Sequence, residues 1–197
     1  LCSHGQAYRL VWRFMHGAGF VLTAVHAAIA FTPLYDVVAG QWMGAPDEIL
    51  EPARVGLQIM LPWTWSIAYR RFHQGVMIAC ERSREVGIGT LVRLAAVLST
   101  LAVGYSLRWP GIIVGSTAIA AGVLSEAFYV GWRVRPLLRQ RVLPATGPPL
   151  TVPAFLRFYV PLAMTPLITL FIQPLGAAAM NRMPRALDSV AAWPAVH

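Results

Sequence analysis

The sequence has few charged residues and no lysine. Charged side chains make up 12% of its 197 residues, where a soluble domain carries about a quarter. Hydrophobic residues reach 57% and the mean hydropathy is +0.58. This composition excludes an ordinary soluble domain and predicts a membrane protein.

Because lysine is absent, all 16 basic residues are arginine, which we interpret as a composition bias of the genome. The net charge of +8 and the pI of about 10.5 would favour nucleic acid binding in a soluble chain. Here, however, the arginines cluster at the ends of apolar segments, where they orient spans in a bilayer. We therefore expect the lipid bilayer, and no nucleic acid, as a partner.

The residues that carry redox, metal and hydrolytic chemistry are also scarce. The two cysteines, Cys2 and Cys80, are far apart, and Cys80 adjoins an arginine-rich loop typical of the cytoplasm, so we expect no disulfide. His16 and His26 are not four residues apart, the spacing that joins two metal ligands on one helix face. Glu126 is the only acid embedded in a span, without a paired carboxylate or nucleophile. The sequence predicts no cofactor, no metal and no catalytic residue.

Long apolar runs dominate the rest of the sequence. A helix needs about 20 apolar residues to cross a bilayer, and the short alternating segments of a membrane β-barrel are absent. We expect an all-α, polytopic transmembrane helical bundle. Its five probable helices lie at about 11–34, 52–80, 86–107, 111–132 and 155–180.

The loops differ in charge, and this difference predicts the side of the membrane on which each loop lies. The loop at 35–54 contains four acidic residues, whereas ERSRE at 81–85 and the stretch 133–154 are rich in arginine. The positive-inside rule places the basic loops in the cytoplasm and the acidic loop outside. We expect an integral protein of the bacterial inner membrane.

Two stretches of sequence resemble a family of transporters. The segment FLRFYVPLAMTPLITLFIQPLGAAAMNRMPRALDSVAAWPAV at 155–196 runs from an arginine-bearing lead through a proline-containing span to a polar turn. The segment VGSTAIAAGVLSEAF at 114–128 looks like a glycine-rich last helix before a basic linker. Together they resemble the multidrug/oligosaccharidyl-lipid/polysaccharide exporter superfamily, most closely its progressive ankylosis-like branch.

The resemblance implies a MATE-like fold of two helical bundles that transports by alternating access. In it, residues 1–132 would be later helices of the first bundle, 133–154 a cytoplasmic linker, and 155–197 the start of the second bundle. The chain begins with Leu1 and ends in an apolar stretch, so we expect an internal piece of a longer protein.

Members of the superfamily differ in substrate. The resemblance to the ankylosis-like branch implies export of anions that carry phosphate or carboxylate. Other branches of the superfamily transport drugs or lipid-linked sugars. Because embedded positive charge exceeds embedded negative charge, we favour a small anionic substrate. The coupling ion stays open, since the helices that carry coupling carboxylates in several branches are missing. The alternatives are a membrane-embedded enzyme and a structural membrane subunit without transport activity.

The candidate site is a belt of charged residues inside the spans. Arg93 and Glu126 lie equally far in sequence from the RWPG turn at 108–111, so we expect them to pair at one depth. The same folding argument about ERSRE brings Arg70, Arg71 and His73 to that layer. Either the belt lines a cavity and binds an anion, or Arg70 and Arg71 snorkel to the inner surface while Glu126 holds Arg93.

Overall fold

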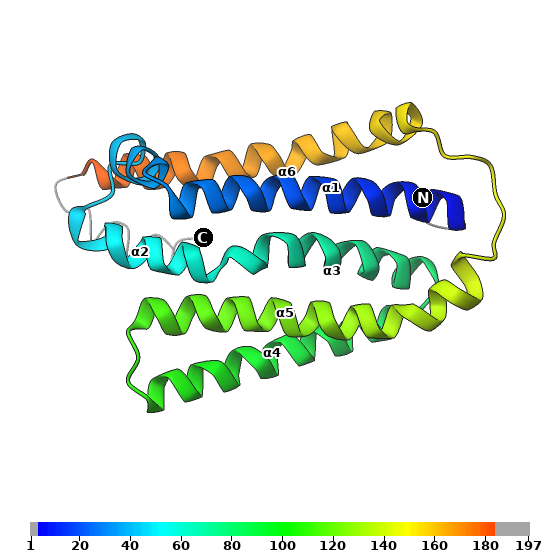
Figure 1. Cartoon of the computed structure of the whole chain (residues 1–197), viewed down its shortest axis with the longest axis horizontal. Helices are drawn as coiled ribbons and strands as arrows, with labels where there is room; N and C mark the ends of the chain where they lie inside the picture. The colour runs from blue at the N-terminus through cyan, green and yellow to red at the C-terminus, as the bar shows by residue number, and fades with distance from the viewer. Residues whose placement is uncertain (1–3, 184–197) are drawn as a thin grey trace. The chain divides into compact units, whose positions relative to one another are not determined.

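A computed structural model of the chain describes residues 4–183, and all of its regular elements there are helices (Figure 1). The all-α prediction is confirmed. Cys2 and the apolar stretch at 188–197 lie outside the described residues. In chain order the elements are α1 (Gly5–Phe31), η1 (Asp36–Trp42), α2 (Asp47–Ile59), α3 (Leu61–Ala79), α4 (Ser83–Ser106), α5 (Gly111–Leu137), η2 (Leu138–Val142) and α6 (Val152–Asn181).

Three of these helices are long and apolar enough to cross a membrane: α1, α4, and α5 continued by η2. Many of their large apolar side chains point outward, as the 73% exposure of Phe20, 64% of Leu91 and 80% of Phe128 shows. Exposed apolar surface of this extent suits contact with lipid. The chain is thus a helical protein with three candidate spans, and the two further crossings stay predictions.

The expected helix at 52–80 is wrong as a single helix, because it breaks at Met60 into α2 and α3. Pro62 lies in the first turn of α3. Proline has no N–H to donate, so it is favoured in the first turn of a helix and costly in its interior. Asp47 and Glu48 occupy the first turn of α2, where negative charge favours the helix dipole.

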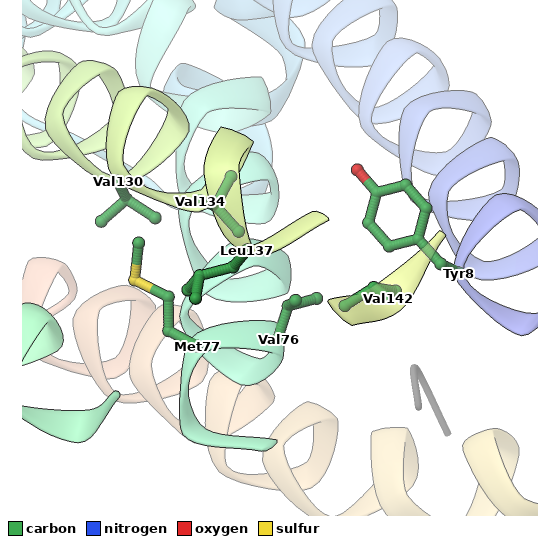
Figure 2. Close-up of a cluster of buried hydrophobic side chains, with 7 residues drawn as sticks. All are labelled: Tyr8, Val76, Met77, Val130, Val134, Leu137 and Val142. Carbon is green, nitrogen blue, oxygen red and sulfur yellow. The ribbon is translucent and has the colours of Figure 1, made fainter. Parts of the chain in front are cut away.

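Helix α5 runs past its expected end at 132 to Leu137 and continues as the π-helix η2 to Val142. Leu137 and Val142 are buried in a hydrophobic cluster that also contains Val130 and Val134, with Val76 and Met77 from α3 and Tyr8 from α1 (Figure 2). Burial of these side chains offsets the cost of extending the helix through arginine-rich sequence and Pro136. The non-helical part of the expected linker is therefore only 143–151.

The described residues form two compact units. The first takes in the chain up to Ala27 and Val55–Leu150, the second Ala28–Arg54 and the chain from Thr151. In the first unit, α5 packs against both α3 and α4. A Cβ atom on Gly122 of α5 would lie 2.6 Å from Val97 Cγ2, so glycine permits this close approach of α4 and α5.

The second unit is organised by hydrogen bonds to backbone carbonyls. Arg54 donates to the carbonyl oxygens of Ala30 and Thr32, and the Tyr35 hydroxyl donates to Leu50 O at 2.7 Å. Burial raises the pKa of Tyr35 above its ordinary value. Asn181 Nδ2 of α6 donates to the carbonyl of Met43 at 2.9 Å, which ties α6 to the loop before α2.

Candidate functional site

The site is built around Glu126, whose side chain on α5 is fully buried at 0% exposure. Arg70 on α3 donates from Nη1 to Glu126 Oε2 at 2.5 Å. Gln74, one helical turn further along α3, donates from Nε2 to Glu126 Oε1 at 2.8 Å. Both carboxylate oxygens are therefore hydrogen-bonded, as a buried charge requires.

Arg93 reaches the same carboxylate from α4. Its Nε lies 3.6 Å from Glu126 Oε2, and its side chain is 42% exposed. The predicted pair of Arg93 and Glu126 is present, and three helices meet at one carboxylate. We call Arg70, Gln74, Arg93 and Glu126 the Glu126 cluster; its two arginines and one glutamate leave a formal charge of +1.

The other two members of the predicted belt lie elsewhere. Arg71 is exposed and makes no ion pair among the described residues. His73 is buried, but its Nδ1 meets the Tyr69 carbonyl oxygen at 2.9 Å and its Nε2 meets the Tyr8 hydroxyl at 3.3 Å. A carbonyl oxygen only accepts, so Nδ1 carries the proton and Nε2 accepts from Tyr8. His73 thus joins α3 to α1 and does not contact Glu126.

The alternative in which Arg70 snorkels to the inner surface is wrong for this residue, because Arg70 is only 4% exposed. Its position on the face of α3 that meets α5 directs the guanidinium at Glu126. Arg71, the next residue, points away and is free to extend toward water. The 100° rotation between adjacent helical residues allows Arg70 to face α5 while Arg71 is exposed.

Unused donors remain in the Glu126 cluster. The buried Nε of Arg70 has no hydrogen-bond partner among the described residues. Glu126 is the acidic partner of Arg93 in the described part of the chain, and the Arg93 side chain is still 42% exposed. Guanidinium groups present several donors in a planar fork that matches phosphate and carboxylate. The cluster can therefore accept an anion beside Arg93.

Sequence reasoning missed Gln74 and a second carboxylate, Glu85 on α4. Arg133 of α5 donates to Glu85 from Nε at 2.9 Å and also from Nη2, and the Tyr129 hydroxyl donates to Oε2 at 2.7 Å. We call these three residues the Glu85 cluster. The missed signals are helical spacings of four: Gln74 follows Arg70, and Arg133 follows Tyr129, on the same helix face.

Histidines in the first unit bind other protein groups. Nε2 of His26 donates to the Leu57 carbonyl oxygen at 2.9 Å, and its Nδ1 accepts from the Thr64 hydroxyl at 2.7 Å. His16 packs against the indole of Trp12, with ring centroids 3.9 Å apart. Within residues 4–183, no three His, Cys, Asp or Glu side chains are grouped so as to hold a metal ion.

The fold and these clusters define an α-helical protein with three candidate membrane spans and a buried, net positive charge cluster. No protein-family model, no curated protein and no solved structure matches the chain. Membership of the exporter superfamily therefore stays a prediction from the sequence patterns described above.

Proposed function

We propose that the chain belongs to a secondary transporter of the multidrug/oligosaccharidyl-lipid/polysaccharide exporter type. In this proposal the protein has a MATE-like fold, lies in the bacterial inner membrane, works by alternating access and exports an anion that carries phosphate or carboxylate. The proposal includes five membrane crossings and a cytoplasmic position for the segment 133–154.

The observation that carries the anion preference is the charge of the Glu126 cluster. Two arginines share one buried carboxylate, so one positive charge is left uncompensated inside a helical bundle. A charge within a membrane span is costly and is a functional hypothesis by default. The Arg93 side chain is 42% exposed, so this arginine is the member of the cluster that a substrate could reach.

Flux measurements on the full-length protein in proteoliposomes test this function. We expect uptake of radiolabelled anions that carry phosphate or carboxylate, and no uptake of organic cations. Transport of organic cations alone would overturn the anion preference. Absence of any flux would favour a structural subunit, and chemical conversion of the label would favour an enzyme.

A matched pair of variants tests the role of Arg93. Arg93→Gln keeps the Arg70 contact with Glu126, so we expect the protein to fold and the anion flux to fall by about tenfold, the cost of one hydrogen bond to a charged group. Arg84→Gln removes an exposed arginine at the start of the same helix and serves as the control. Equal flux in the two variants would remove Arg93 from the substrate path.

The proposed topology has its own test. Single cysteines in place of Arg139 and Asp47 would be labelled with a membrane-impermeant maleimide in intact cells and in inverted vesicles. We expect labelling from opposite sides, because the basic end of α5 and the acidic loop follow the positive-inside rule. Labelling of both positions from one side would contradict this topology.

A further inference from the structure

A groove of about 310 Å³ runs between α3 and α5 in the first unit. Its walls are mostly apolar and aromatic, with Trp65 and Tyr69 from α3 facing Phe128 and Trp132 from α5. Phe128 is 80% exposed and Trp132 58% exposed, so both can contact a molecule in the groove. The groove follows an outward-facing apolar surface of a helix long enough to cross a membrane.

A second cavity of about 390 Å³ adjoins this groove at the basic end of α5. The two share Trp132 and Arg135, and the second adds Arg139 and Gln140. Arg135 and Arg139 are exposed and have no acidic partner among residues 4–183. Arg133 differs, because Glu85 already neutralises it. The apolar groove thus opens at one end into a pocket with two unpaired positive charges.

From this juxtaposition we propose that the groove and the pocket bind one anionic phospholipid. An acyl chain lies in the groove against Trp65 and Phe128, and the lipid phosphate accepts hydrogen bonds from Arg135 and Arg139. Trp132 lies where the two cavities meet. Indole rings prefer the boundary between hydrocarbon and head groups, so this position suits the junction of acyl chain and lipid phosphate. This binding does not depend on the proposed transport.

The amphiphilic order of the site favours a lipid over a soluble phosphate. Arginines at the end of a membrane helix attract anionic head groups, and each arginine near the charged surface contributes about fivefold in affinity. A soluble anion would use the arginines but leave the aromatic groove unfilled. A zwitterionic lipid would fill the groove without matching the charge of the pocket.

Native mass spectrometry of the full-length protein, released from detergent after incubation with lipid, tests the proposal. Phosphatidylglycerol is compared with phosphatidylcholine of the same acyl chains. We expect preferential retention of phosphatidylglycerol, and we expect the R135Q/R139Q variant to lower that preference by about fivefold for each arginine. The control R84Q/R157Q removes two exposed arginines that line neither cavity and should keep the preference.

The groove is tested separately with Leu124→Trp, which adds bulk at a lining position that is 41% exposed. We expect this variant to lose retention of phosphatidylglycerol several-fold while the protein stays folded. Equal retention of the two lipids by the wild-type protein, or an equal loss in R84Q/R157Q, would overturn the proposal. Displacement of the lipid by soluble glycerol phosphate would overturn it in favour of a phosphate site.

Discussion

The Glu126 and Glu85 clusters use the same chemistry in opposite surroundings. Each is a glutamate held by an arginine across a helix contact of α5. The side chains of Glu126 and Arg70 are 0% and 5% exposed, whereas those of Glu85 and Arg133 are 13% and 40% exposed. Both carboxylates are hydrogen-bonded through both oxygens, so the two clusters differ mainly in their burial.

Burial decides the cost of losing a partner. A buried ion pair adds little net stability over apolar residues, because desolvation offsets the attraction. Removing one partner, however, leaves a charge that water cannot reach. At the Glu85 cluster, water can solvate whatever is left unpaired, so the same loss is smaller. The Glu126 cluster therefore acts as a constraint on how α3, α4 and α5 meet.

The largest effect is expected from Glu126→Gln. The substitution keeps the shape but leaves buried Arg70 without a counter-charge, so we expect a loss of about 3–5 kcal/mol in the free energy of unfolding. Thermal unfolding of the purified protein in detergent measures it. Glu48→Gln, at an exposed position of α2, is the matched control. A loss no larger than that of the control would show that the Glu126 cluster does not constrain the packing of α3, α4 and α5.

The next effect concerns the contact of α4 with α5 that brings Arg93 to Glu126. In Gly122→Ala the new methyl group would lie 2.6 Å from Val97 Cγ2, and we expect a loss of about 1–3 kcal/mol from overpacking. Gly115→Ala is the control on the same helix, where nothing lies within 4 Å. Alanine should be neutral or stabilising there. Equal effects at the two glycines would contradict close packing.

A smaller effect is expected from Glu85→Gln, the same isosteric change in the partly exposed cluster. We expect a modest drop in the unfolding temperature, because Arg133 is left partly solvated. High salt should reduce this difference, since ions screen exposed pairs, but should leave the loss from Glu126→Gln unchanged. Thermal unfolding at low and high salt measures both. If salt does not change the effect of Glu85→Gln, the pair of Glu85 and Arg133 is not screened by ions, which would contradict its description as a partly exposed pair.

The smallest effect is expected from Tyr129→Phe, which removes one hydrogen bond to Glu85 and keeps its contacts with Arg133. We expect a loss of about 1 kcal/mol in the free energy of unfolding, because water at this partly exposed cluster replaces much of the lost hydrogen bond. Urea unfolding in mixed micelles, compared with the wild-type protein, checks it. A loss as large as that of Glu126→Gln would contradict this prediction and would show that the Tyr129 hydroxyl is essential to the Glu85 cluster.

The sequence predicts the helical class and one contact of the site. Arg93 and Glu126 flank the RWPG turn at equal distances, and an antiparallel helix pair must bring such residues to one depth. The same argument applies to Glu85 and Arg133, which lie about 24 residues from that turn. The sequence does not predict this pair, because the expected helices at 86–107 and 111–132 leave both residues in loops.

Other features depend on helix rotation and on packing. Depth alone places Arg70, Arg71 and His73 in one layer, but only the face of α3 that meets α5 decides which of them reaches Glu126. The break at Met60 carries a proline signal, Pro62, inside an otherwise continuous apolar run. The extension of α5 to Leu137 depends on side chains from α1 and α3 that the local sequence does not contain.

The hydrogen bonds of His26 restrain the chain at the break at Met60. A single imidazole on α1 holds the Leu57 carbonyl on α2 and the Thr64 hydroxyl on α3, one on each side of the break. The chain can bend at a break in a helix, and the two hydrogen bonds of His26 oppose such a bend at Met60. A change of angle at Met60 must therefore stretch at least one of these two hydrogen bonds, so His26 fixes the residues on either side of the break, Leu57 and Thr64, to one point on α1.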